Sequence, residues 1–214
     1  MADTAPRREP LVLLIVVVTV FVALGIAPEA DRLTWFLENV PVVIGVPILV
    51  WTSRSFPLTP LTYRLIAVHA VILMVGGYYT YAAVPLGNWA SDAFNLGRNH
   101  YDRLGHLAQG FIPAMIAREF LIRRSPLRPG GMLSFLVVCY CLAFSAFFEL
   151  FEWWTAVAFG AASNAYLGSQ GDIWDAQWDM FMCLIGAVVA LALLSKMQDR
   201  QLRAFGLMPD APRA

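Results

Sequence analysis

The chain has 214 residues, of which 59% are apolar and only 14% are charged, and its mean hydropathy is +0.62. Soluble domains are more charged and less apolar, so the composition predicts a membrane protein. Fifteen Lys and Arg residues balance fifteen Asp and Glu residues, and without a basic surplus we expect no nucleic-acid partner. Three cysteines lie in apolar runs without C-x-x-C spacing and are interpreted as packing residues: Cys139, Cys141 and Cys183.

Six apolar segments follow one another along the chain, each long enough to cross a bilayer as a helix. They predict an all-α, polytopic membrane helix bundle, with residues 1–214 forming one integral membrane domain. The candidate spans are residues 11–27, 35–51, 61–84, 101–122, 132–159 and 173–195. Because Arg7 and Arg8 precede the first run, it also resembles a secretory signal, but its length and Pro28 favour a membrane helix.

Two of the six segments are less apolar than the others. The second contains Glu38, Pro41 and Pro47. The fourth contains Asp102, Arg103, His106, Pro113, Arg118 and Glu119. We expect neighbouring helices to shield these side chains from lipid.

The distribution of Lys and Arg predicts the orientation. With six spans and a cytoplasmic N-terminus, the inner segments hold Arg7, Arg8, Arg54, Arg64, Arg118, Arg123, Arg124, Arg128, Lys196, Arg200, Arg203 and Arg213, whereas the outer segments hold Arg32, Arg98 and Arg103. This bias is typical of cytoplasmic loops, so both termini are predicted to be cytoplasmic. We interpret the basic residues around Arg118 to Arg128 as topology determinants that contact anionic headgroups.

In this topology acidic residues gather near the outer boundary. Glu149 and Glu152 end the fifth span, Asp175 and Asp179 begin the sixth, and Asp102 begins the fourth. At a rise of 1.5 Å per residue, all of them lie within roughly 15 Å of that boundary. Residues three, four or seven apart share one face of a helix, so three polar stripes are predicted to face one another.

An ionised carboxylate facing lipid at mid-bilayer costs about 2.5 to 3.5 kcal/mol. We therefore expect these acids to line an outward-facing cavity and to need protons, water or a metal ion. The predicted metal ligands are Glu149, Glu152, Asp175 and Asp179. Such oxygen ligands favour Mg, Mn or Ca, whereas a contribution from His106 would suit Zn or Fe.

Structural roles compete with these chemical ones. Asp172 is positioned to cap a helix, and Asp175 suits a helix dipole. Glu149 and Glu152 could each belong to a structural ion pair or a helix clamp. Asp102 with Arg103 and His106 could form an interfacial network. His69, alone on the third span, is interpreted as a hydrogen-bonding residue between helices.

Three blocks of sequence resemble a known family. They are YDRLGHLAQG at 101–110, FELFEWW at 148–154 and LGSQGDIWDAQWDM at 167–180. These blocks are similar to the YjdF-like family of bacterial inner-membrane proteins. The resemblance implies a location in the bacterial inner membrane but implies no particular biochemical activity.

A more distant likeness is to the VanZ-like membrane proteins, with D-K-x-x-H, E-x-x-Q and D-x-x-x-N patterns. The positions here are Asp102, Arg103 and His106, then Glu149 and Glu152, then Asp175, Asp179 and Gly186. Arg103, Glu152 and Asp179 depart from that pattern, and the second and third departures add negative charge. The likeness implies a role at the outer face of the envelope.

Three functions remain open. The first is a cation-dependent enzyme on lipid or lipid-linked substrates, with His106 as general acid or base, Asp102 tuning it and Arg103 holding the substrate anion. The second is a small cation- or proton-coupled transporter, which the prolines of broken helices would suit. The third is a structural or accessory membrane subunit.

Overall fold

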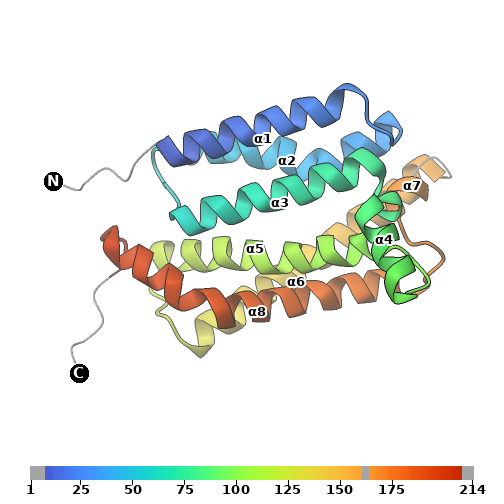
Figure 1. Cartoon of the computed structure of the whole chain (residues 1–214). Helices are drawn as coiled ribbons and strands as arrows, with labels where there is room; N and C mark the ends of the chain where they lie inside the picture. Colours follow the sequence, from blue (N-terminus) through green and yellow to red (C-terminus); the bar gives the residue numbers. More distant parts are fainter. Residues whose placement is uncertain (1–7, 161–163, 209–214) are drawn as a thin grey trace.

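The computed structural model describes residues 8–160 and 164–208, and every regular element in these ranges is helical (Figure 1). The long helices are α1 (Arg8–Ile26), α2 (Arg32–Thr52), α3 (Pro60–Tyr79), α5 (Tyr101–Arg124), α6 (Gly131–Phe159) and α8 (Asp175–Ala204). The short ones are the 3-10 helix η1 (Tyr81–Ala83), α4 (Pro85–Phe94) and α7 (Asn164–Leu167). The predicted all-α class is confirmed.

The long helices lie side by side as one bundle (Figure 1). Helix α5 is the central element, because it packs against α3, α6 and above all α8. On the other side of the bundle, α1 and α2 each pack against α3. The bundle therefore consists of an α1–α2–α3 group and an α5–α6–α8 group, joined through the α3–α5 contact.

Five of these helices are long and apolar enough to cross a membrane: α1, α2, α3, α6 and α8. Helix α5 does not meet that standard, although its 24 residues give it the length. Its polar residues are buried against its neighbours, among them Asp102, Arg103, His106, Arg118 and Glu119. The expectation that neighbouring helices shield the fourth segment is thus met.

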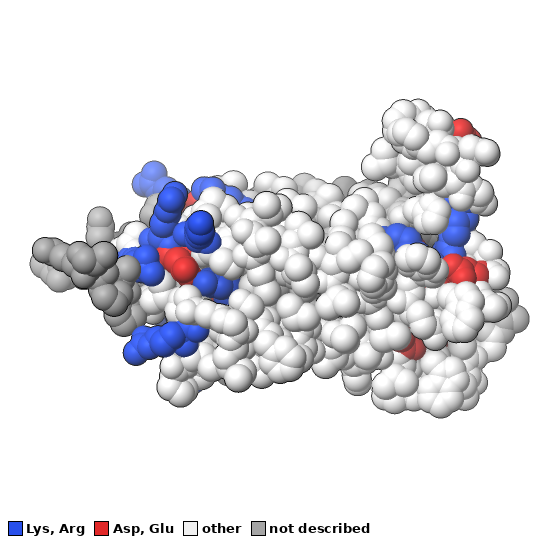
Figure 2. All heavy atoms as spheres, turned by 90° about the horizontal axis from the view of Figure 1, so that it is seen from below, with Lys and Arg blue, Asp and Glu red and all other residues white. Residues whose placement is uncertain are grey.

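Charged side chains gather at the two ends of the bundle. One end, where α3 begins and α5 and α8 end, carries Arg64, Arg118, Arg123, Arg124, Arg128, Lys196, Arg200 and Arg203; we call it the basic end. The opposite end, where α5 and α8 begin, carries the acids of the predicted site, and we call it the acidic end. Figure 2 shows these two charged groups separated by a middle zone without Lys, Arg, Asp or Glu on this face.

Two predicted span boundaries are corrected. The third span, predicted as 61–84, ends at Tyr79, because Thr80 adopts a positive φ of 70° and η1 follows. Tyr81 then folds back so that its ring lies against Gly76, where a Cβ would meet the ring. The sixth span, predicted as 173–195, continues to Ala204, with Gln198 and Leu202 fully buried in its last turns.

Helix α2 begins at a well-formed N-cap. The Asp31 carboxylate accepts hydrogen bonds from the backbone N–H groups of Leu33 and Thr34, both at 3.0 Å, and from the Thr34 hydroxyl at 2.6 Å. These bonds satisfy amide groups that have no partner within the helix. They also lower the pKa of Asp31, with the Thr34 hydroxyl as the largest cause.

Glycines bring α5 and α8 into backbone contact. A Cβ on Gly110 would strike the Cys183 carbonyl, and a Cβ on Gly186 would strike the Leu107 carbonyl. Cys183 and Cys141 are buried beside this contact, whereas Cys139 is exposed. The packing interpretation therefore holds for Cys141 and Cys183 and is wrong for Cys139.

Candidate functional site

Two arginines hold three aspartates at the acidic end. On α5, Arg103 donates to Asp172 at 3.0 Å and to Asp175 at 2.8 Å, and it also pairs with Asp179. Arg98, three residues before α5, donates to Asp172 at 3.2 Å and to Asp175 at 3.1 Å. We call these five residues the arginine clamp. It ties the start of α5 to the start of α8 by charge-assisted bonds.

The loop before α5 is fixed by Asn99. Its side chain donates to the Val84 carbonyl at 2.9 Å and accepts from the Tyr101 amide at 2.9 Å. Its backbone exchanges hydrogen bonds with the Gln170 side chain, at 3.1 and 2.8 Å. The segment that carries Arg98 is therefore anchored both to the residues after α3 and to the segment before α8.

A small cavity of about 40 Å³ is lined by Asp102 and His106, which neighbour Arg103 on α5. That volume is large enough for a water molecule or an ion but too small for an organic substrate, which would have to approach an ion bound here from outside the cavity. Polar side chains from five helices and from η1 line it: Glu38, His69, Tyr81, Asp102, His106, Gln109, Glu152 and Tyr166. We call this space the acidic cavity.

Polar atoms around the acidic cavity lack hydrogen-bond partners among the described residues. Four such atoms belong to residues that line it: His69 Nε2, His106 Nδ1, Gln109 Nε2 and Tyr166 Oη. Two others, Ser145 Oγ and Glu149 Oε1, lie on α6 outside its lining. Buried polar groups in folded proteins are nearly always paired, and each exception needs an explanation. In this cavity a water molecule or an ion could supply the missing partners.

Three side chains could ligate a metal ion together. One ligand atom each from Asp102, His106 and Asp179 lies within 4.8 Å of the others. His106 Nε2 is 3.5 Å from Asp102 Oδ1 and 3.9 Å from Asp179 Oδ1. Ligand atoms around a tetrahedral ion, at bond lengths of about 2.0–2.2 Å, are roughly 3.3–3.6 Å apart. The two His106 distances are close to this range, whereas the ligand atoms of Asp102 and Asp179 lie within the wider limit of 4.8 Å of each other, so these carboxylates would have to move toward a common ion.

The other predicted metal ligands occupy different places. Glu149 Oε1 lies 3.9 Å from His106 Nδ1, on the side of the ring away from the three-residue group. Glu152 lines the acidic cavity. Asp175 lies within the arginine clamp, with both Arg98 and Arg103 bonded to its Oδ1 atom.

Two structural interpretations from the sequence are wrong. Asp172 is not the N-cap of α8, a position that Trp174 occupies; it belongs to the clamp instead. His69 was expected to hydrogen-bond between helices, but its Nε2 has no partner among the described residues. It faces the acidic cavity.

Sequence reasoning missed three residues of this cavity. Glu38 lies two turns into α2 and is 5% exposed, and only its isolation in an apolar run could have pointed to it. Tyr81 and Tyr166 lie outside the long helices. Burial raises the pKa of both phenols. The nearby Glu38 carboxylate raises the pKa of Tyr81 further, and the nearby Glu152 carboxylate raises that of Tyr166 further. Both hydroxyls are therefore neutral and able to donate.

A second buried polar cluster lies at the basic end. The Glu119 carboxylate is fully buried and accepts from the Thr59 amide and hydroxyl, the Thr62 hydroxyl and Arg123. Arg118 is also buried and donates to Gln198 and Asp199. It therefore does more than the predicted topology role, because it joins α5 to α8.

These features define a class: a polytopic helical membrane protein with a buried cavity lined by acids and histidines. Comparison with known proteins gives the family. Residues 9–200 match the family described as predicted membrane protein (DUF2238). The chain is 52% identical over 178 residues to the inner membrane protein YjdF of Escherichia coli (strain K12), covering 83% of this chain and 85% of that protein.

The chain therefore belongs to the YjdF family of inner-membrane proteins, as the three sequence blocks indicated, and it resides in the bacterial inner membrane. No solved structure matches it. The likeness to VanZ-like proteins has no support among these matches and stays a prediction.

Proposed function

We propose that the protein is a metal-dependent enzyme of the inner membrane that hydrolyses lipid or lipid-linked substrates at the outer face. In this proposal the chain crosses the membrane six times, since α5 also spans it in addition to the five candidate helices, and both termini and the basic end lie in the cytoplasm. The excess of Lys and Arg at the basic end supports this orientation. The acidic end would then face outward.

One observation supports the proposal most strongly. Buried polar atoms without partners in the described parts of the chain lie around the acidic cavity, next to Asp102, His106 and Asp179, whose ligand atoms are close enough together to bind one metal ion. Among the described residues, only Arg98 and Arg103 balance the carboxylates of this site. A divalent ion bound by Asp102, His106 and Asp179 would offset the remaining negative charge. A set of one imidazole and two carboxylates suits Zn, Mn or Fe. Such an ion activates water for hydrolysis.

The surrounding residues then take distinct roles. Glu149 Oε1 faces the other nitrogen of His106 at 3.9 Å. If this distance closed to about 3 Å on ion binding, Glu149 would accept the Nδ1 proton and orient the ring, so that Nε2 could bind the ion. Glu152 is positioned across the cavity to accept a proton from water. The arginine clamp fixes Asp179 and shields the acids. Arg103 is thus a positioning residue rather than a holder of the substrate anion.

A cation-coupled transporter is the second candidate, because the basic end also holds buried polar residues on α5 and α8. Two observations favour the enzyme. The Glu119 carboxylate already has hydrogen-bond partners on all sides. Between the two polar clusters, α5 and α8 touch through Gly110 and Gly186, which leaves no space for an ion to pass between these two helices.

The test uses the full chain in vesicles of bacterial phospholipid doped with a polyprenyl phosphate ester. Products are followed by mass spectrometry, before and after chelation and after Zn or Mn is returned. We expect a product that requires both protein and metal, with turnover at least 100-fold lower in Glu152→Gln. Asp92→Asn, which changes an exposed acid on α4, is the matched control.

If Glu152→Gln matches this control, the proposed role of Glu152 is wrong. Metal-driven cation flux without any product would instead favour the transporter. Lower thermal stability of the variant without product or flux would favour a structural role.

A further inference from the structure

A larger cavity lies at the other end of the molecule, between α1, α2 and α3. Its volume is about 530 Å³. Helices α1 and α2 meet near the acidic end, where the Phe21 and Trp35 rings lie 5.4 Å apart and Arg32 donates to the carbonyls of Gly25 and Ile26. Nearer the basic end the cavity lies between the first half of α1 and the last turns of α2.

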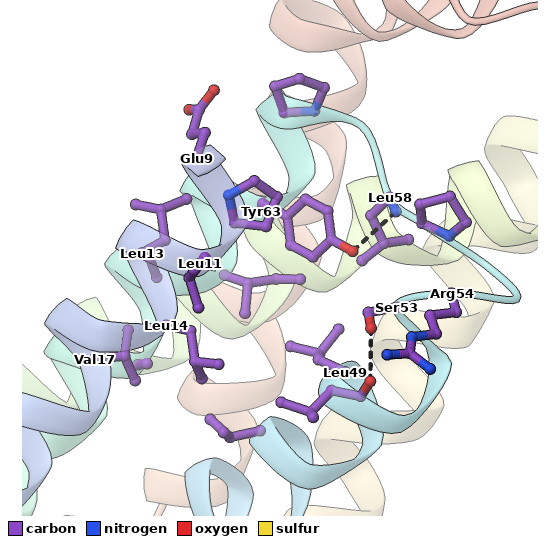
Figure 3. Close-up of a pocket in the computed structure, with 18 residues that line it drawn as sticks. Glu9, Leu11, Leu13, Leu14, Val17, Leu49, Ser53, Arg54, Leu58 and Tyr63 are labelled. Atoms are coloured by element: carbon purple, nitrogen blue, oxygen red, sulfur yellow. Dashed lines mark hydrogen bonds between the residues drawn. The ribbon is translucent and has the colours of Figure 1, made fainter. Parts of the chain in front are cut away.

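The cavity walls are apolar. Figure 3 shows Leu11, Leu14 and Val17 of α1 on one side of the cavity and Leu49 of α2 on the other, with Tyr63 of α3 lying next to Leu58. Leu11 and Val50, on opposite walls, are 56% and 50% exposed, so the cavity opens to its surroundings. Because α1 to α3 are membrane-spanning candidates, those surroundings are lipid.

The size of the cavity limits its occupant. A helical turn with side chains has a diameter of about 10–12 Å and a pitch of 5.4 Å, so one turn alone takes up roughly this volume. A partner helix crossing the membrane would not fit. A flexible hydrocarbon chain would fit, because it can follow the space between three helices.

The charges at the rim of the cavity favour an anionic headgroup. Glu9 is neutralised by Arg64, which bonds to both of its oxygens. Arg54, at the end of α2 beside Ser53, is exposed and forms no ion pair with any described residue. The Tyr63 hydroxyl accepts from the Leu58 amide at 3.3 Å and retains its own proton to donate. The rim is therefore a net cationic site with a donor hydroxyl.

We propose that this cavity binds one anionic phospholipid of the surrounding bilayer, with an acyl chain between α1 and α2 and the phosphate at Arg54. Apolar walls bury the chain, and the unpaired guanidinium recognises the phosphate. Cationic side chains at a membrane surface attract anionic lipids in the same way. This site is independent of the acidic cavity and of the proposed enzyme activity.

The test is native mass spectrometry of the detergent-purified full chain titrated with phosphatidylglycerol or phosphatidylcholine. We expect one molecule of phosphatidylglycerol to bind more tightly than phosphatidylcholine. Arg54→Gln should weaken phosphatidylglycerol binding about fivefold, the factor typical of one surface arginine on anionic lipid. Arg128→Gln, which removes an exposed arginine at the same end, should leave binding unchanged.

Filling the cavity tests the acyl-chain site separately. Ala67→Phe on α3 and Val46→Phe on α2 each place a ring in the cavity and should weaken binding of the lipid at least tenfold. Two variants are used so that misfolding of one does not decide the result. Val43→Phe, on the exposed face of α2, is the control. Equal binding of both lipids to the wild type, or equal binding by the filled variants and Val43→Phe, would overturn the proposal.

Discussion

Arg103 on α5 and Asp175 on α8 lie 2.8 Å apart, from Nη2 to Oδ1, with the Arg103 side chain 9% exposed and the Asp175 side chain 13% exposed. The same guanidinium also bonds to Asp172, Asp179 and the Asp175 carbonyl. One cation thereby organises three carboxylates beside the acidic cavity. Removing it would leave the buried Asp179 carboxylate without a guanidinium partner, whereas Asp172 and Asp175 would keep Arg98.

Arg103→Gln is expected to be among the most destabilising single changes in the chain. Breaking a buried ion pair by removing one partner costs about 3–5 kcal/mol. Arg103→Lys should lose less, because it keeps the charge but not the planar fork that bonds to several oxygens. Thermal unfolding in detergent measures both, with Arg128→Gln as an exposed control. Equal midpoints for Arg103→Gln and Arg128→Gln would contradict the clamp.

The contact between α5 and α8 predicts sensitivity to a single methyl group. Gly110→Ala would place a Cβ against the Cys183 carbonyl, forcing the helices apart at a cost of about 1–3 kcal/mol or more. Gly45→Ala on α2 is the matched control, since a Cβ there meets nothing within 4 Å. The thermal midpoint should fall for Gly110→Ala and should hold or rise for Gly45→Ala. The reverse order would refute the close contact.

The N-cap of α2 predicts a pH-dependent effect. Asp31→Ala should lower stability by about 0.5–2 kcal/mol at neutral pH, and Asp31→Ser should lower it less. The pKa of Asp31 is lowered from its usual value of 3.8, so the carboxylate contributes fully above that value. Its contribution disappears as pH falls through the lowered folded-state pKa. Denaturation midpoints of wild type and Asp31→Ala should therefore converge below about pH 4, and a gap that widens there would be inconsistent with the cap.

The proposed topology predicts the sides on which reporters lie. A phosphatase fused after Gly130, between α5 and α6, should be inactive because it stays in the cytoplasm, and a fluorescent reporter there should be bright. A fusion within residues 160–170, between α6 and α8, should give the opposite result. Reversed signals would place the acidic end in the cytoplasm and would remove the argument for an outer-face substrate.

Much of the bundle could be predicted from the sequence, because hydropathy and helical length are local properties. Boundaries were wrong where tertiary contacts decide them. Helix α3 stops at Thr80 because the chain turns to place Tyr81 against Gly76. Residues 85–100, which join the third and fourth predicted spans, contain α4, which begins at Pro85.

The acids of the site were found because their depth follows from helix direction. The sequence could not predict which of these acids bond to an arginine and which line the cavity. That depends on which carboxylates Arg98 and Arg103 reach between α5 and α8. Glu38 was missed for a related reason. Its helix carries no other acid within the span, so no stripe marks its cavity-facing side.

The central claim is that Asp102, His106 and Asp179 hold a metal ion, and elemental analysis of the detergent-purified protein tests it most directly. We predict close to one transition-metal ion per chain in the wild type and in Asp92→Asn. The ion should be lost in Asp102→Asn and in Asp179→Asn, each checked for folding by size-exclusion profile and thermal midpoint. A folded wild-type protein that holds no metal after purification in metal-supplemented buffer would contradict the claim, as would unchanged metal content in both variants.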